Sequence, residues 1–436
     1  MKNILKKILR LNRRILLSLG GVGGGILLLL FSFSLTAQQQ RFPKPEFESG
    51  YEQPSPTTPE PRLTAWEYVD VGVLILVMSL AAWFAIRKRS RKGILWLGVF
   101  SLVYFGFYRE GCVCSVGSIQ NMALTLFDPA YAISIPIVLF FALPLLFSLF
   151  FGRVFCASAC PLGVIQDLVI IKPINIPNWL NKSLGFIPYI YLGLAVLLAA
   201  TGSDFIICRY DPFIGIFRRG AEFSMIILGI AFLLMGLFVA RPYCRFLCPY
   251  GVLLGWTSKF SKHHLTITPK ECISCKLCEH SCPFNVIDQP TEPLKPEQKA
   301  LNKKRFTIYT LLIPVWIVAG GFTLSLAHPF LSKAHPDVYL AELLIKHPEL
   351  KDDTENLDIQ TFLSSGKPMQ QLVDEAKVIR SEYYTGSWIL GGFLGLVIGI
   401  MLMNQFVLRR RTDYTPNKMG CYSCGRCMDY CPVKNP

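Results

Sequence analysis

The stretch CISCKLCEHSCP, residues 272–283, sets four cysteines at the spacing C-x2-C-x2-C-x3-C-P. The stretch CYSCGRCMDYCP, residues 421–432, repeats this spacing near the end of the chain. It is the bacterial ferredoxin spacing for [4Fe–4S] clusters, in which three closely spaced thiolates wrap one cluster. Two complete copies predict two such clusters. A structural zinc site is less well matched, since zinc favours two C-x2-C pairs set well apart.

The ligand sets follow from the way two such motifs fold together. The fourth cysteine, just before proline, typically binds the cluster of the other motif. We therefore expect the tail of the chain to return to the first motif; pairing within each motif is the alternative. The expected sets are Cys272, Cys275, Cys278 and Cys431 for one cluster, and Cys421, Cys424, Cys427 and Cys282 for the other.

The rest of the chain is mostly apolar. Of its 436 residues 52% are hydrophobic, and several apolar runs are long enough to span hydrocarbon. The net charge of +15 does not predict nucleic-acid binding, because the basic residues cluster beside apolar runs, as orientation signals do. The sequence therefore predicts an α-helical, multi-pass protein of the bacterial inner membrane, in contact with lipid and not with nucleic acid.

About eight transmembrane helices are expected, with both chain ends in the cytoplasm, because the clusters of Lys and Arg mark inner ends. The first apolar run is a helix that stays in the membrane or a cleaved signal peptide. The expected spans cover residues 15–36, 69–86, 94–108, 131–151, 186–201, 223–240, 306–326 and 388–408.

The expected domains follow this topology. Both ferredoxin motifs lie on the cytoplasmic side, where they can form one module although a membrane hairpin separates them in sequence. The order is an N-terminal helix or signal anchor (1–37), an extracytoplasmic linker (38–66), a duplicated transmembrane core (67–260), the first ferredoxin motif (261–298), a transmembrane hairpin (299–408) with an extracytoplasmic segment (327–386), and the second ferredoxin motif (409–436).

A second cysteine pattern, C-x3-C-P-x-G, occurs in FCASACPLGV (155–164) and in YCRFLCPYGV (243–252). Each copy follows a span that descends to the inside. This predicts an internal parallel repeat about an axis along the membrane normal, as in some transporters. Thiols that only pack are the alternative to a cofactor site. The four cysteines that could meet at this axis and hold a further iron–sulfur centre or another metal are Cys156, Cys160, Cys244 and Cys248.

Three more cysteines, Cys112, Cys114 and Cys208, fall in loops expected on the outer side. In an oxidising compartment they could form a disulfide. They could also contribute to a redox site near the outer surface. If the repeat brings the two loops together, the three thiols converge, and we treat them as candidate cofactor-binding residues.

This combination of motifs resembles the NosR/NapH group of polyferredoxin membrane proteins. The resemblance rests on the C-x3-C-P pairs, the ferredoxin motifs and the segment 111–121, and it covers roughly residues 67–290 and 412–436. It implies cytoplasmic [4Fe–4S] clusters and electron delivery toward an extracytoplasmic reductase or flavin. NosR-like proteins carry an outer domain with covalent FMN; we find no Ser/Thr-Gly-Ala-Ser/Thr motif for it here. A separate flavoprotein or cytochrome partner is therefore expected.

The leading hypothesis is a membrane-bound iron–sulfur electron-transfer protein. It would connect cytoplasmic clusters or quinol with an extracytoplasmic acceptor such as a reductase or flavoprotein. We expect a component of an oxidoreductase system with no catalytic residues of its own. A membrane redox sensor or regulator is the first alternative, and a metal- or cofactor-assembly protein is the second.

Overall fold

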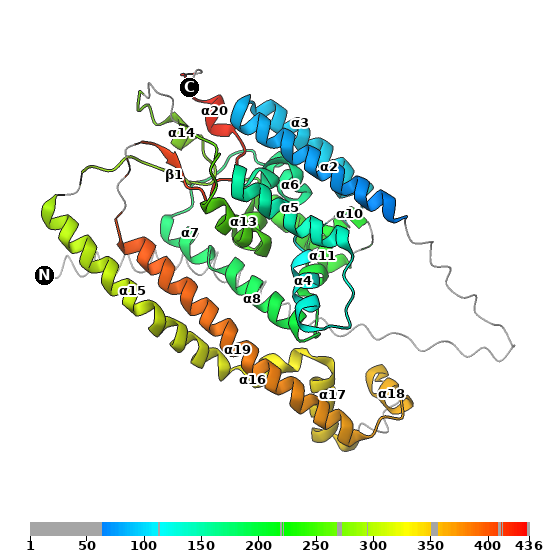
Figure 1. Cartoon of the computed structure of the whole chain (residues 1–436). Helices are drawn as coiled ribbons and strands as arrows, with labels where there is room; N and C mark the ends of the chain where they lie inside the picture. Colours follow the sequence, from blue (N-terminus) through cyan, green and yellow to red (C-terminus); the bar gives the residue numbers. More distant parts are fainter. Residues whose placement is uncertain are drawn as a thin grey trace, which may run out of the picture. The chain divides into compact units, whose positions relative to one another are not determined.

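Long apolar runs form the longest helices of the computed structural model (Figure 1), which is mostly helical as predicted. The structure describes residues 63–111, 114–218, 220, 222–267, 273–293, 295–349, 356–408, 411 and 413–433. The expected N-terminal helix and most of the linker lie outside the described residues, as do Cys112 and Cys272.

The chain divides into two units. One comprises residues 58–342 and 369–436 and contains all the described cysteines. The other comprises residues 1–57 and 343–368. Its described part contains helix α18, Leu357–Ser364, which begins after Asn356. The Asn356 side chain accepts hydrogen bonds from the backbone N–H groups of Asp358 and Ile359 and so caps that helix.

Four helical segments of the described residues are long and apolar enough to cross a membrane. They coincide with four expected spans. Two shorter apolar helices, α5 (Ile135–Phe151) and α11 (Phe223–Gly236), and the continuous pair α3 (Arg91–Ser101) and η3 (Leu102–Tyr108) match three more. The four long segments are α2 (Thr64–Ala82) continued by η2 (Trp83–Arg87), α7 (Asn178–Leu184) with α8 (Ile187–Ala200), α15 (Pro296–Ser325), and α19 (Met369–Phe406).

Helix α19 is longer than the span expected from hydropathy. It begins at Met369 rather than at Trp388, so that the polar residues before the apolar run belong to the same helix. Gln, Glu, Ala, Lys and Arg in that part are good helix formers. Lys377 and Asp374, one turn apart, form an ion pair of 2.9 Å. Hydropathy predicts only the apolar half of α19. The helix continues through the polar half because those residues favour helix and pair one turn apart.

Helices α15 and α19 pack along a seam of glycines and run side by side in Figure 1. A methyl group at Gly391 would collide with the carbonyl oxygen of Gly320, and one at Gly395 with that of Trp316. Small residues allow such close approach of membrane helices, where packing rather than hydrophobicity drives association. Outward-facing Leu311 of α15 is exposed, as a lipid-facing residue would be.

The only sheet of the described residues joins the two ferredoxin motifs. Strand β1 (Ile287–Asp288) pairs antiparallel with β2 (Thr415–Pro416). Arg411 adds an ion pair of 2.8 Å to Asp288. The tail of the chain therefore returns to the first motif, as expected. Two single-turn helices follow within the motifs, α14 (Leu277–His280) and α20 (Arg426–Asp429).

Both C-x3-C-P segments contribute to one buried hydrophobic cluster of the described residues. The first cysteine of each lies within a short helix, η4 (Phe155–Ala159) or α12 (Pro242–Phe246), and the proline after each second cysteine starts a new helix, α6 (Pro161–Leu168) or α13 (Pro249–Lys259). Proline suits that first helical position because its missing N–H would have no partner there. The remaining elements are α4 (Ser118–Phe127), α9 (Ile206–Arg209), α10 (Ile214–Arg218), α16 (His328–Leu331), η5 (Ser332–Ala334) and α17 (Pro336–Lys346).

We predict that Gly391→Leu destabilises the protein, because the added side chain cannot fit against the backbone of α15. Overpacking typically costs about 1–3 kcal/mol, and we expect the Tm in detergent micelles to fall by roughly 1–3 °C, because a chain of this length has an unfolding entropy of about 0.9 kcal/mol/K. Ile389→Leu, at an exposed position of the same helix, is the control and should leave the Tm unchanged. An unaltered Tm in Gly391→Leu would contradict the observed seam.

Candidate functional site

Four predicted cluster ligands line one pocket. Cys421, Cys424 and Cys427 come from the second motif and Cys282 from the first. All but Cys424 are buried. This is the cross-motif ligand set expected from the sequence, and the rest of the pocket is mostly apolar, as the shell of an iron–sulfur cluster should be. Its other walls include Leu265, Ile267, Phe284, Val286, Ile287 and Tyr422.

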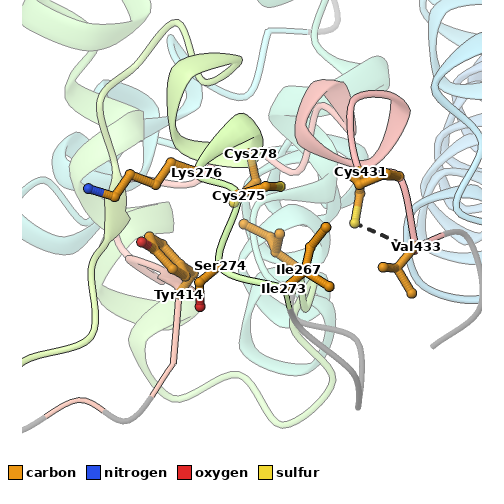
Figure 2. Close-up of a pocket in the computed structure, with 10 residues that line it drawn as sticks. Ile267, Ile273, Ser274, Cys275, Lys276, Cys278, Tyr414, Cys431 and Val433 are labelled. Carbon is orange, nitrogen blue, oxygen red and sulfur yellow. Dashed lines mark hydrogen bonds between the residues drawn. The ribbon is translucent and has the colours of Figure 1, made fainter.

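A second pocket is lined by the other set (Figure 2). Cys275 and Cys278 come from the first motif and Cys431 from the second, with Ile267 and Ile273 among the apolar residues between them. The Cys431 thiol donates a hydrogen bond of 3.4 Å to the carbonyl oxygen of Val433. The fourth expected ligand, Cys272, lies outside the described residues, so that three of the four are described here.

The backbone follows the same path around both pockets. Ser274 and Lys276, which flank Cys275, have φ of 52° and 60°; Ser423 and Gly425, which flank Cys424, have φ of 52° and 75°. Left-handed conformations on both sides of one residue curl the chain tightly. This curl lets Cys275 and Cys278 of the first motif, and Cys421, Cys424 and Cys427 of the second, line a pocket across a short stretch of chain.

Burial keeps these thiols protonated until a metal binds. Desolvation raises the pKa of Cys421 to about 12, and the neighbouring Cys424 and Cys282 thiols add to the rise although hydrogen bonding to the backbone of Ser423 opposes it. Desolvation also raises the pKa of Cys282. Because iron binds the thiolate, loading the pocket must release protons.

The C-x3-C-P cysteines converge in the adjoining core. Burial raises the pKa of Cys160, and the nearby thiols of Cys244, Cys156 and Cys248 raise it further. Thiols of both segments are thus close enough to repel one another when ionised. The Gln166 side chain donates a hydrogen bond of 3.2 Å to the Cys244 sulfur. The structure therefore brings the four predicted residues together.

Two arginine side chains each reach from one C-x3-C-P segment to the other. Arg241, fully buried, donates a 2.5 Å hydrogen bond to the carbonyl oxygen of Cys156. A methyl group at Gly163 would lie 3.3 Å from Arg241 Nη1, and one at Gly251 would lie 3.1 Å from Arg153 Nη2. Each segment's arginine thus reaches the glycine of the other segment. The glycine of the C-x3-C-P-x-G pattern leaves room for that guanidinium.

Asp167 joins the C-x3-C-P core to the second ferredoxin motif. Its carboxylate accepts a 2.6 Å hydrogen bond from Arg91 and lies 3.6 Å from Arg241 and 3.4 Å from Arg426. Arg91 also donates to the carbonyl oxygen of Cys424 at 2.7 Å. Burial alone would raise the pKa of Asp167, but the three guanidinium groups hold it below its usual value. Sequence reasoning missed Asp167, which belongs to no motif.

The two cysteine loops that the sequence predicts on the outer side also meet. A methyl group at Gly117 would lie 2.9 Å from the Cys208 sulfur and 3.9 Å from the Cys114 sulfur. Gln120 fastens the loops, since its side-chain oxygen accepts a 2.9 Å hydrogen bond from the backbone N–H of Ile207. Cys114 and Cys208 therefore converge as expected, while Cys112 lies outside the described residues.

Tyrosines occupy the spaces between the three groups of thiols. Tyr422, between two ferredoxin cysteines in sequence, donates a 3.1 Å hydrogen bond to the carbonyl oxygen of Cys244. On the other side, the Tyr243 ring contacts Phe213 of the Cys208 loop, with ring centroids 5.4 Å apart. In that loop burial raises the pKa of Asp211 to about 6. The sequence offered one signal: each tyrosine is next to a motif cysteine.

We predict that Asp167→Asn loosens the second ferredoxin motif, because it leaves buried guanidinium groups without a counter-charge. Removing one partner of a buried ion pair typically costs about 3–5 kcal/mol. Hydrogen exchange of residues 413–433 should rise by at least tenfold. Asp374→Asn, which removes an exposed ion pair, is the control and should change exchange in neither motif.

The pH dependence has a definite sign. Because the folded-state pKa of Asp167 is lowered from 3.8, its contribution to stability is fully present above about pH 5 and is lost as the pH falls through the folded-state pKa. The difference in Tm between wild type and Asp167→Asn should be constant from pH 5 to 7 and narrow below about pH 4. A difference that grows on acidification would contradict the ion-pair network.

Comparison with known proteins agrees with the prediction, made from the cysteine motifs, that the chain binds iron–sulfur clusters. Residues 133–186 and 222–268 match a family model described as a 4Fe-4S binding domain, and residues 265–288 match a second one with the same description. The first match includes both C-x3-C-P segments, and the second includes the first ferredoxin motif. No solved structure matches the chain.

Several relatives with names are similar over part of the chain. Protein NirI of Paracoccus denitrificans is 29% identical over 53% of this chain and 37% of its own length. The regulatory protein NosR of Pseudomonas aeruginosa is 29% identical over 50% of this chain and 34% of its own. The putative electron transport protein YccM of Escherichia coli is 27% identical over 32% and 43%. The chain thus spans less than half the length of these relatives. With its 4Fe-4S binding domains and these relatives, the chain is similar to NosR/NapH-type ferredoxin membrane proteins.

Proposed function

We propose that the protein passes electrons between cytoplasmic iron–sulfur clusters or quinol and an extracytoplasmic acceptor such as a reductase, flavoprotein or cytochrome. One observation carries the proposal. Thiols form three groups, the ferredoxin pockets, the C-x3-C-P core and the Cys114–Cys208 pair, with Tyr422 hydrogen-bonded to the backbone of Cys244 and the Tyr243 ring packed against Phe213 of the Cys208 loop. A series of neighbouring thiol groups suits a protein that moves electrons from one group to the next.

The proposed cofactors are two [4Fe–4S] clusters. One would be held by Cys421, Cys424, Cys427 and Cys282, and the other by Cys272, Cys275, Cys278 and Cys431. When bound, such clusters supply one-electron oxidation and reduction at potentials set by burial and by hydrogen bonds to sulfur. The Arg91 contact to the backbone of Cys424 fixes one ligand loop. A further centre at the C-x3-C-P thiols, near Arg153 and Arg241, completes the proposal; no covalent FMN is included.

The proposed topology has eight spans in the bacterial inner membrane, with both ferredoxin motifs on the cytoplasmic side. The α15–α19 hairpin supports it, because it returns the chain to the first motif. The proposed internal repeat has separate support. Arg153 and Arg241 precede corresponding cysteines and reach each other's glycine, a reciprocal contact that a twofold relation between the segments requires.

A redox-sensing role is the second candidate, because the relative NosR carries the description of a regulatory protein. In that case the clusters would report redox state to a partner. The two functions differ in what they need from the outer thiols. A conduit requires Cys114 and Cys208, while a sensor that signals from the inner motifs does not.

We predict that the full chain, purified without oxygen, contains at least about eight iron atoms, the content of two [4Fe–4S] clusters, with any iron at the C-x3-C-P centre in addition. Reduction should produce the low-temperature EPR signals of two [4Fe–4S] clusters. Cys427→Ser should lower the iron content by about four atoms, because it removes a ligand of one cluster only. Cys208→Ser is the control with full ferredoxin loading. Zinc in place of iron would refute the cluster assignment.

We predict that Cys114→Ser and Cys208→Ser block electron transfer across the membrane. In proteoliposomes with reductant enclosed on the side of the ferredoxin motifs, reduction of an impermeant acceptor on the other side should fall at least tenfold. The inner clusters should still be reduced, as their EPR signals would report. Undiminished transfer in both variants would instead favour the sensor.

A further inference from the structure

Cys114 and Cys208 form a pair of thiols that belongs to neither ferredoxin pocket nor to the C-x3-C-P core. Both sulfur atoms lie within 3.9 Å of one point, the place where a methyl group at Gly117 would be. Cys114 lies just before helix α4 and Cys208 lies within α9, so the pair joins two segments that are far apart in sequence. Bonded sulfurs lie about 2.05 Å apart. Two thiols that share so small a space can therefore close to a disulfide with a small movement of their side chains.

The Gln120 side chain holds the two segments against each other. It is fully buried, and its oxygen accepts hydrogen bonds from the backbone N–H groups of Ile207 at 2.9 Å and Cys208 at 3.4 Å. Its amide nitrogen donates to the carbonyl oxygen of Asp204 at 3.4 Å. An amide that uses both its acceptor and a donor on one loop fixes that loop in position. A residue of α4 thus positions Cys208 beside Cys114.

The two thiols differ in how accessible they are. Cys208 is exposed, whereas Cys114 is partly buried. In thiol–disulfide exchange an accessible thiolate attacks a disulfide, and a second thiol close by then resolves the mixed disulfide. An exposed thiol with a more covered one beside it suits these two roles, with Cys208 as the attacking thiol and Cys114 as the resolving thiol.

Charged groups act on both thiols. Desolvation raises the pKa of Cys114 to about 12, and the Asp211 carboxylate adds to the rise, while the backbone N–H of Gly117 opposes it. Desolvation and Asp211 also raise the pKa of Cys208, whereas Arg218 opposes that rise. The cation favours the thiolate of the exposed cysteine. Burial raises the pKa of Asp211 to about 6, so that an acid–base group able to exchange protons near neutral pH serves the pair.

We propose that Cys114 and Cys208 are a redox-active dithiol that reduces disulfide bonds on the side of the membrane proposed as extracytoplasmic. The Cys208 thiolate attacks one sulfur of the substrate disulfide, a bond to that sulfur forms, and the other substrate sulfur leaves as a thiolate. The Cys114 thiolate then attacks the Cys208 sulfur, closes the Cys114–Cys208 bond and releases the second substrate sulfur. The two protons of the dithiol pass to the two substrate sulfurs.

Regeneration of the dithiol rests on the proposed function, which supplies the electrons. Reduction of the Cys114–Cys208 disulfide takes two electrons, one from each of the two reduced [4Fe–4S] clusters, which become oxidised. The sulfur–sulfur bond breaks, and two protons from water restore the two thiols. The pair thereby converts one-electron steps into the two-electron reduction of a disulfide.

The exchange is tested with the full chain in lipid nanodiscs without oxygen, with oxidised glutathione in one arm and insulin, a protein with disulfides, in the other. Alkylation and mass spectrometry map the thiols. We expect wild-type protein to reduce one disulfide per chain and to end with Cys114 bonded to Cys208; the arm that reacts identifies the source. Cys114→Ser should retain a mixed disulfide on Cys208, because no second thiol resolves it. Cys208→Ser should react at least tenfold more slowly.

A second variant tests the geometry without removing a thiol. Gly117→Ala adds a methyl group 2.9 Å from the Cys208 sulfur, which should shift the equilibrium from disulfide toward dithiol at least tenfold in mixtures of oxidised and reduced dithiothreitol. Gly72→Ala is the matched control, since open space surrounds Gly72, and it should match wild type. An unchanged equilibrium in Gly117→Ala would contradict the proposed pair.

Failure of this inference is distinct from failure of the proposed function. In proteoliposomes, dithionite enclosed on the side of the ferredoxin motifs should reopen the Cys114–Cys208 disulfide, which an impermeant maleimide outside reports by labelling Cys208. Exchange in nanodiscs without this reopening refutes the proposed function and supports the exchange site. The inference is overturned by absence of a Cys114–Cys208 disulfide in both arms, by a disulfide that reduced dithiothreitol does not reopen, or by a metal ion bound to both thiols.

Discussion

A single buried carboxylate, that of Asp167, holds several cysteine-bearing segments of the described chain together. Asp167 extends from the helix after the first C-x3-C-P motif and meets guanidinium groups from three other parts of the chain. One of them, Arg426, belongs to the tail, and another, Arg241, belongs to the second C-x3-C-P segment. Because all the groups are mostly buried, their charges attract strongly and each would be costly alone. The network therefore fixes the tail against the core.

The Asp167 network also determines which groups of thiols are neighbours. With the tail fixed, Tyr422 bridges the ferredoxin pocket and the backbone of Cys244. The crossing arginines, Arg153 and Arg241, balance the charge that ionised thiols would carry in a buried core. Tyr243 in turn contacts Phe213 of the Cys208 loop. The same packing therefore brings the three groups of thiols close to one another.

Two helices differ from expectation, and the difference in the first has a physical explanation. Helix α19 exceeds its apolar run because polar residues with high helix propensity precede that run, and hydropathy does not register them. The segment expected as the third span changes from α-helix to π-helix at Leu102. The described chain thus shows four helices of full membrane length, while the shorter apolar helices pack around the C-x3-C-P segments in the same core.

The sequence by itself determined the chemistry and the helical class. Cysteine spacing predicts which thiols wrap a cluster, because three ligands within seven residues reflect local backbone geometry. Apolar runs predict helices, because hydrocarbon leaves backbone groups no other partners. Only the tertiary structure decided which distant groups meet. The packing of the tail decides that Asp167 pairs with Arg426 and that Tyr422 meets the backbone of Cys244. It also favours the expected grouping of Cys282 with the second motif over pairing within each motif. Contacts between remote segments leave no periodic signal in the sequence.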